Sequence, residues 1–136
     1  MSLMDMMIRE AQKSEVIHQH AAFLLRKKSI VSSGHNIYYD GYDRCGRKYS
    51  IHAEEKCIQD FIENNTIKKR GAMVMVIIRY SKINDSSLGL SIPCKKCEQC
   101  IEDFNKKFPQ ARIRRIYYSA EPLGGRGERA YTIPVR

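Results

Sequence analysis

Two short motifs carry residue types that bind metals and move protons. The first is His52-Ala53-Glu54, and the second is Pro93-Cys94-Lys95-Lys96-Cys97. One imidazole nitrogen and two thiolate sulfurs are ligands of the kind that Zn²⁺ prefers, and a catalytic zinc site keeps its fourth position for water. Two thiolates also balance the 2+ charge of the ion. The two motifs therefore predict a zinc site formed by His52, Cys94 and Cys97.

Both motifs are expected to begin helices. Cys94 and Cys97 are three residues apart, so one helical turn brings their sulfurs to the same side. His52 precedes a stretch with apolar residues at helical spacing. The positive ends of both helices would then point at the metal, which favours thiolates. Glu54, in the first turn, can lean over its helix end toward the same ion and transfer protons there.

A second interpretation is a structural zinc site, which usually has four protein ligands. Cys100, three residues after Cys97, is the fourth ligand that this interpretation needs. We favour Cys100 as a core thiol beside Ile101 and Phe104, because free cysteine behaves as a small hydrophobic residue. Glu55 is expected to face solvent, and Cys57 to lie in the core.

The hydrophobic pattern predicts the order helix, strand, strand, helix, strand, helix, strand, strand. The predicted strands are 21–25, 29–33, 72–78, 112–119 and 131–135; the helices run from near Met4, from His52 and after Pro93; loops are expected over 36–50 and 84–90. Helices alternating with strands indicate an α/β fold. The glycine-rich segment 121–130 is too short for a parallel crossover, so the last two strands are predicted to be antiparallel.

Length and composition predict one intracellular domain spanning 1–136. The five cysteines are an odd number, and the chain start lacks a secretory signal pattern, so metal binding is favoured over a disulfide framework. The longest apolar run is too short to span a bilayer, and no membrane contact is expected. The net charge of +9 favours phosphate-bearing partners, including nucleic acid; a solvated basic surface is the alternative.

Three further segments, together with the two motifs, resemble the sequences of a known protein superfamily. With Gly34-His35-Asn36, Ser91-Ile92-Pro93-Cys94 and Ile116-Tyr117-Tyr118-Ser119, the two motifs resemble the cytidine and deoxycytidylate deaminase superfamily over most of the chain. The resemblance implies a three-layer α/β/α fold with a central mixed five-stranded sheet. It also implies a homo-oligomer, because relatives commonly assemble.

The same resemblance implies roles for individual residues. It gives His52, Cys94 and Cys97 as Zn²⁺ ligands and Glu54 as the catalytic proton shuttle. It also gives Asn36 and Ala53 as substrate-binding residues. For Asn36 the alternative is a turn residue without contact to substrate.

The implied activity is hydrolytic removal of an amine, converting a cytosine nucleotide (CMP or dCMP) or nucleoside to the uracil form. One alternative is the same chemistry on cytosine or adenine in RNA or single-stranded DNA. Another is a zinc-stabilised binding module without catalysis. Histidine at position 52 is usual in the deoxycytidylate, tRNA-adenosine and polynucleotide branches, whereas free-nucleoside enzymes usually carry cysteine there. The substrate therefore stays open.

Other polar residues near the motifs have two interpretations each. Lys95 and Lys96 either hold a substrate phosphate or form a solvated helix face, and Arg126 and Arg129 are similar candidates. Tyrosines in the loop before His52 either stack on a base or pack the loop; they are Tyr38, Tyr39, Tyr42 and Tyr49. His18, His20 and His35 have no ligand spacing and are taken as ordinary polar residues, and Cys45 as an exposed thiol.

Overall fold

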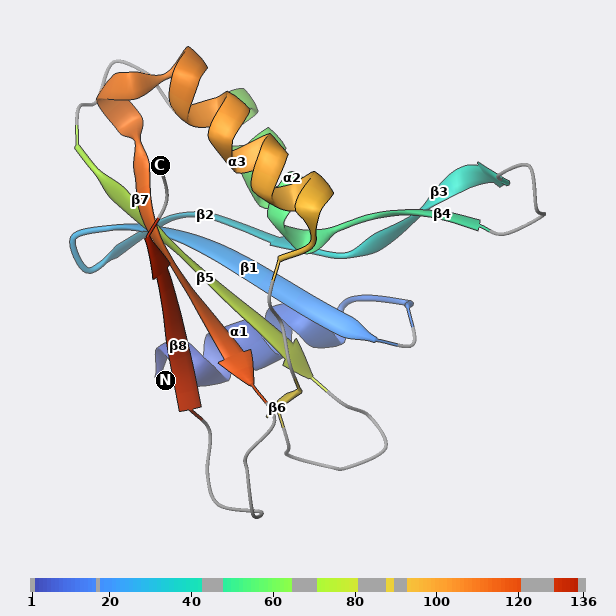
Figure 1. Cartoon of the computed structure of the whole chain (residues 1–136). Helices are drawn as coiled ribbons and strands as arrows, with labels where there is room; N and C mark the ends of the chain where they lie inside the picture. Colours follow the sequence, from blue (N-terminus) through green and yellow to red (C-terminus); the bar gives the residue numbers. More distant parts are fainter. Residues whose placement is uncertain are drawn as a thin grey trace.

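The computed structural model describes residues 2–16, 18–42, 48–64, 71–80, 88–89, 93–120 and 129–134. In chain order the elements are α1 (Leu3–Gln12), β1 (Gln19–Arg26), β2 (Ser29–His35), β3 (Ile37–Tyr42), β4 (Lys48–Ile51), α2 (Ala53–Asn64), β5 (Met73–Tyr80), β6 (Leu88–Gly89), α3 (Lys95–Lys107), the 3-10 turn η1 (Pro109–Ala111), β7 (Ile113–Ala120) and β8 (Arg129–Pro134). The predicted order of helices and strands is present (Figure 1). β3, β4 and β6 are additional strands.

The main sheet is mixed. Its strand order is β2-β1-β5-β7-β8, and the short β6 also pairs with β5. β1 is antiparallel to both neighbours, β5 and β7 are parallel, and β7 and β8 are antiparallel. The predicted antiparallel ending is confirmed, whereas the predicted count of five strands omits β6, which lies in a segment expected to be a loop. The parallel pair brings the carboxyl ends of β5 and β7 to one edge, the position where α/β sheets form ligand sites.

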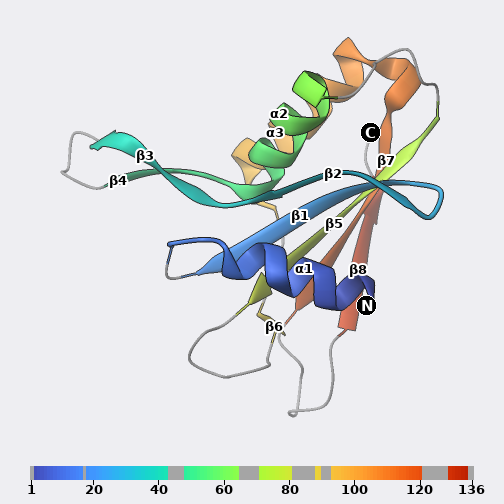
Figure 2. The same ribbon diagram turned by 180° about the vertical axis from the view of Figure 1, so that it is seen from behind.

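Helices cover both faces of the sheet. α1 lies against β1 and β5 on one face, while α2 packs on β2 and β1 on the other, with α3 beside it (Figures 1 and 2). This arrangement confirms the three-layer α/β/α fold. Within the described part of the chain, no helix combines the length and apolar character that crossing a membrane requires.

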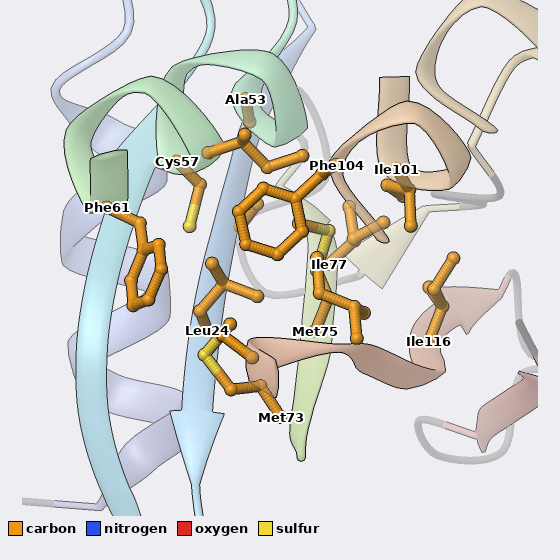
Figure 3. Packing of buried hydrophobic residues seen from close by; sticks show 14 residues of the cluster. Leu24, Ala53, Cys57, Phe61, Met73, Met75, Ile77, Ile101, Phe104 and Ile116 are labelled. Carbon is orange, nitrogen blue, oxygen red and sulfur yellow. The ribbon is translucent and has the colours of Figure 1, made fainter. Parts of the chain in front are cut away.

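The strands supply two hydrophobic clusters by alternation. In β1, Ala22 and Leu24 belong to the cluster under α2 and α3, whereas Phe23 belongs to the cluster under α1. Successive strand side chains point to opposite faces, so β1 is buried on both sides. In the larger cluster, Phe61 of α2 meets Phe104 of α3 edge to face, with ring centroids 5.8 Å apart (Figure 3). This contact holds the two helices together.

The loop prediction for 36–50 was wrong, because β3 and β4 form a separate two-stranded sheet there. Ile37 pairs with Ile51 and Tyr38 pairs with Ser50 in antiparallel register. Tyrosine and isoleucine favour strands, and the interspersed glycine and charged residues conceal the alternation that would have revealed the hairpin. The hairpin extends away from the main sheet (Figures 1 and 2).

Gly34 allows α2 to lie unusually close to β2. A Cβ atom at this position would lie 2.6 Å from the main-chain nitrogen of Cys57 and 2.9 Å from the carbonyl oxygen of Ala53. Both atoms belong to the α2 backbone, so no side-chain movement would relieve the clash. The absence of a side chain at Gly34 therefore sets how near the start of α2 lies to the sheet.

Candidate metal centre

The three predicted metal ligands lie at the beginnings of two helices. The His52 carbonyl accepts the main-chain N–H of Lys56 at 3.0 Å, so His52 immediately precedes the first turn of α2. The Cys94 carbonyl likewise accepts the N–H of Glu98 at 2.9 Å and begins α3. Cys97 follows one turn later and is buried. Both helices thus direct their positive ends toward the same place.

The ligand atoms converge at distances that suit zinc. His52 Nδ1 lies 3.2 Å from Cys97 Sγ and 3.5 Å from Cys94 Sγ, and the three atoms all lie within 4.8 Å of one another. A tetrahedral zinc ion with ordinary Zn–N and Zn–S bonds separates nitrogen from sulfur by about 3.6 Å. The donor set therefore fits Zn²⁺, and Nδ1 is the imidazole atom that faces both sulfurs.

The electrostatics of the site also fit a cation. Burial raises the pKa of the Cys97 thiol, and the neighbouring Glu54 carboxylate raises it further. Burial likewise raises the pKa of Glu54, against smaller opposing effects from hydrogen bonding to Cys97 and from His52. Burial and the adjacent carboxylate therefore both disfavour the Cys97 thiolate, and burial disfavours the Glu54 carboxylate. A divalent cation between them supplies the missing countercharge.

Glu54 and Glu55 occupy different environments, although they are adjacent in the first turn of α2. Glu54 is buried and interacts with the side chain of Cys97. Glu55 is half-buried, and its Oε1 lies 3.6 Å from Nζ of the exposed Lys96 on α3. The expectation that Glu55 faces open solvent was therefore wrong, because α3 packs close enough to partly cover it. Lys96 therefore forms an ion pair with Glu55. Lys95 is exposed.

A cavity of about 230 Å³ opens beside the ligands. Its described lining combines predicted site residues with residues from the start of β1; the full set is Val16, His18, His20, Asn36, Ser50, His52, Ala53, Glu54 and Cys94. The cavity therefore brings Asn36 and Ala53 together with Glu54 and two of the metal ligands. Sequence reasoning missed Val16, His18, His20 and Ser50.

Asn36 is tied to the main chain at both ends of its amide. Its Nδ2 donates to the His18 carbonyl at 2.7 Å, and its Oδ1 accepts the His20 N–H at 2.9 Å. Its own carbonyl accepts the Ser14 hydroxyl at 2.7 Å. Asn36 thus holds the segment that leads into β1 while one side of its buried side chain lines the cavity. Asn36 therefore has a structural role and also lines the cavity.

His20 faces the cavity in one fixed tautomer at neutral pH. Burial lowers the pKa of His20, so its ring is neutral near pH 7. Its Nδ1 lies 3.1 Å from the His18 carbonyl, an acceptor only, so Nδ1 carries the proton and Nε2 is an acceptor. The sequence offered one signal for this role: His20 directly precedes the apolar run from Ala21 to Leu25.

The structure describes the positions of some of the other candidate residues but not of all. Cys100 is half-buried against the large hydrophobic cluster and is not in the group of metal-ligating atoms found among the described residues, as the core interpretation expected. Cys57 is fully buried in that cluster, and burial raises its pKa to about 12. The Nδ1 atom of His35 lies 3.2 Å from Oε2 of Glu10. The remaining candidates lie outside the described residues or side chains: Tyr39, Tyr42, Cys45, Tyr49, Arg126 and Arg129.

The fold and the His-Cys-Cys centre define a zinc-binding α/β protein. The sequence profile described as "Cytidine and deoxycytidylate deaminase zinc-binding region" matches residues 1–119. The chain therefore belongs to the cytidine and deoxycytidylate deaminase family. No curated protein sequence matches it.

Solved structures share the fold at low sequence identity. A dCMP deaminase from the cyanophage S-TIM5, in complex with dCMP and dUMP, matches with a TM-score of 0.56 and 17% identity over 85% of this chain and 76% of its own. Its apo form gives 0.57 and 18% over 90% and 82%. A cytidine deaminase from Burkholderia pseudomallei gives 0.54 and 12% over 99% and 94%.

Proposed function

We propose that this protein is a zinc-dependent hydrolytic deaminase that converts a cytosine nucleotide of the CMP or dCMP type, or its nucleoside, to the uracil form and releases ammonia. The observation that carries the proposal is the convergence of His52 Nδ1 with two cysteine sulfurs beside a buried glutamate in a cavity. We also propose that the whole chain, 1–136, is a single domain devoted to this reaction.

The roles of the residues follow from their positions. His52, Cys94 and Cys97 would hold the ion, and when bound there Zn²⁺ supplies Lewis-acid activation of water. Glu54 lies against the same site, and its carboxylate accepts a proton from the water and delivers it to the departing amine. The base gains the water oxygen and loses ammonia, so no other reactant is required. Ala53 and Asn36 line the cavity in which the base binds.

A second substrate class is cytosine or adenine within RNA or single-stranded DNA. The net charge of +9 favours it, because basic proteins attract the phosphate backbone. The exposed Arg114 and Arg115 of β7 contribute to that charge. A zinc-stabilised binding module without catalysis is less well supported, because such a module does not require a buried glutamate, Glu54, beside the metal ligands.

A homo-oligomer is part of the proposal. Among the described residues, β3 and β4 make their main contacts with each other, and the hairpin extends away from the main sheet (Figure 2). An isolated two-stranded hairpin is marginally stable in water, so packing against a second copy would stabilise it. Light scattering on the purified protein tests this part directly.

The test of the activity is a substrate panel on metal-replete protein. Ammonia release is followed with cytidine, deoxycytidine, CMP, dCMP, single-stranded DNA, RNA and adenosine-containing tRNA. The proposal expects turnover of monomeric cytosine compounds. Turnover of polymers alone would replace the substrate class, and zinc binding without turnover of any amine would leave only the binding module.

A further inference from the structure

An arginine and a histidine form a pair at the edge of the cavity. Arg79 Nη2, near the end of β5, lies 2.7 Å from His18 Nδ1. A guanidinium has donors only, so the Nδ1 of His18 accepts and its Nε2 carries the ring proton. His18 lines the cavity that contains His52, Glu54 and Cys94. The pair therefore presents N–H donors and a permanent positive charge beside the proposed active site.

The pair is held in place by its surroundings. The main-chain N–H of Arg79 donates to the hydroxyl of the buried Ser119 on β7 at 3.2 Å. Arg79 is also the direct cross-strand partner of His20, which lines the cavity. On the other side, the carbonyl of His18 accepts from Asn36 Nδ2 at 2.7 Å. Hydrogen bonds thus anchor the main chains of both residues, and their two side chains contact each other.

Among the described residues, Arg79 has no acidic partner. In the part of the chain that the structure describes, no carboxylate lies within ion-pair distance of Arg79. Other cations differ: Lys13 and Lys96 lie 3.2 Å and 3.6 Å from carboxylates. Arginine binds phosphate with charge-assisted, bidentate hydrogen bonds, which makes a guanidinium at a cavity edge suited to a phosphate group.

We propose that Arg79 and His18 bind the phosphate of a nucleoside monophosphate, so that the enzyme selects the nucleotide over the nucleoside. This inference rests on the proposed function, because it places the base beside Glu54 and the phosphate beside His18, which lines the same cavity. A dianionic monoester is the occupant, rather than a diester within a polymer, because it offers more charge and more acceptor oxygens to the pair.

The test compares kcat/KM for dCMP and deoxycytidine in wild-type protein and in Arg79→Gln. The ratio of the two values is expected to fall by about 10- to 100-fold in the variant, the loss that accompanies removal of a hydrogen bond to a charged group. Arg79→Lys is expected to fall less, because it keeps the charge but not the fork of donors. His18→Gln gives a second, independent variant should Arg79→Gln fail to fold.

The matched control is Arg114→Gln. Arg114 is an exposed arginine near the start of β7, whereas Arg79 lies toward the end of the parallel neighbour β5, about 16 Å along the strands. Its removal changes the net charge equally and is expected to leave the ratio unchanged. Thermal unfolding and zinc content of each variant separate loss of fold or metal from loss of phosphate binding.

The outcomes distinguish the inference from the function beneath it. If wild-type protein deaminates dCMP and deoxycytidine and the ratio is the same in Arg79→Gln, Arg79→Lys and His18→Gln, the phosphate site is wrong and the deaminase remains. If Arg114→Gln lowers the ratio as much as Arg79→Gln, the effect is long-range and the assignment fails. If single-stranded DNA is preferred over dCMP, the monoester is the wrong occupant. If no cytosine compound is turned over, both proposals fail.

Discussion

The N-terminus of α1 differs from the N-termini of α2 and α3 in what its first side chains do. In all three helices the residue before the first turn accepts the first helical hydrogen bond; it is Ser2 for α1, His52 for α2 and Cys94 for α3. In α1, Ser2 and Asp5 form a capping box, with Asp5 N–H donating to Ser2 Oγ at 3.1 Å. In α3, Cys94 makes no side-chain capping hydrogen bond. The N-terminus of α1 is capped by its own side chains, whereas α2 and α3 begin at residues that could bind one metal ion.

The difference shows how one fold separates stability from function. Serine and aspartate close a helix end with local hydrogen bonds. Histidine and cysteine are poor caps, but the positive helix ends behind them stabilise thiolates and anions. The N-termini of α2 and α3 are therefore expected to depend on the metal, and the N-terminus of α1 to be indifferent to it.

The largest effect is expected for Cys97→Ser. Loss of this buried thiolate removes one of three ligands, so zinc content should fall far below one per chain and deamination by at least about 1,000-fold. Metal analysis and ammonia release measure the two effects. Cys100→Ser is the matched control, because Cys100 lies one turn further along α3 in contact with the core. Comparable zinc loss in Cys100→Ser would mean that the site is structural.

Glu54→Gln should separate metal binding from proton transfer. The amide keeps the size of the side chain but cannot carry protons, so turnover should fall by about 100- to 10,000-fold while zinc is retained. Zinc content and steady-state rates are measured on the same preparation. Glu55→Gln, one position along the helix and facing Lys96, should change the rate little. Zinc loss from Glu54→Gln would make Glu54 a ligand and contradict its assigned role.

Gly34→Ala should disturb the start of α2 through the sheet. The added methyl would lie 2.6 Å from the Cys57 nitrogen, so α2 must shift away from β2 at a cost of about 1–3 kcal/mol in the free energy of unfolding. Because His52 begins this helix, zinc affinity should weaken as well. Denaturant unfolding and a chelator competition measure both effects. Ser29→Ala, exposed on the same strand, serves as the control; equal behaviour of the two variants would remove the steric argument.

The smallest effect is expected at the start of α1. Ser2→Ala removes the capping side chain and should cost about 1 kcal/mol in the free energy of unfolding, with no change in zinc content. Thermal unfolding in zinc-loaded and chelated protein tests the contrast, since the cost should be the same in both. A cost that disappears on chelation would mean that the N-terminus of α1 is coupled to the metal centre.

The same cap has a pH dependence of known sign. The hydrogen bond from Ser2 is the main cause that lowers the pKa of Asp5 below 3.8. Because the folded-state pKa is the lower one, the contribution of Asp5 is present above pH 3.8 and is lost as the pH falls through the folded-state value. The stability difference between wild type and Ser2→Ala should therefore shrink in acid.

The metal ligands were predictable although His52 lies 42 residues from Cys94, because each motif carries zinc-binding residue types at a helix start and the two motifs together resemble a known family. Cys94 and Cys97 are one helical turn apart, and His52 begins a helix with a clear apolar stripe. The pairing of β7 with β8 was also predictable, because the intervening segment excludes a helical crossover. Within each motif or segment, spacing and residue type carry the prediction.

The edge of the cavity was not predictable, because long-range contacts create it. His18 meets Arg79, 61 residues away, only after β1 pairs with β5. Glu55 is covered only because α3 packs beside α2. The β3–β4 hairpin was missed because its alternation is interrupted by glycine and charged residues. In each case the tertiary neighbour, rather than the local sequence, determines the environment.

X-ray absorption at the zinc edge tests the central claim most directly. The account predicts two sulfur scatterers at about 2.3 Å and two nitrogen or oxygen scatterers at about 2.0–2.1 Å, one of them lost when His52 is replaced by alanine. Three or four sulfurs around the ion would contradict it, because an additional cysteine would then occupy the position that catalysis requires to be open.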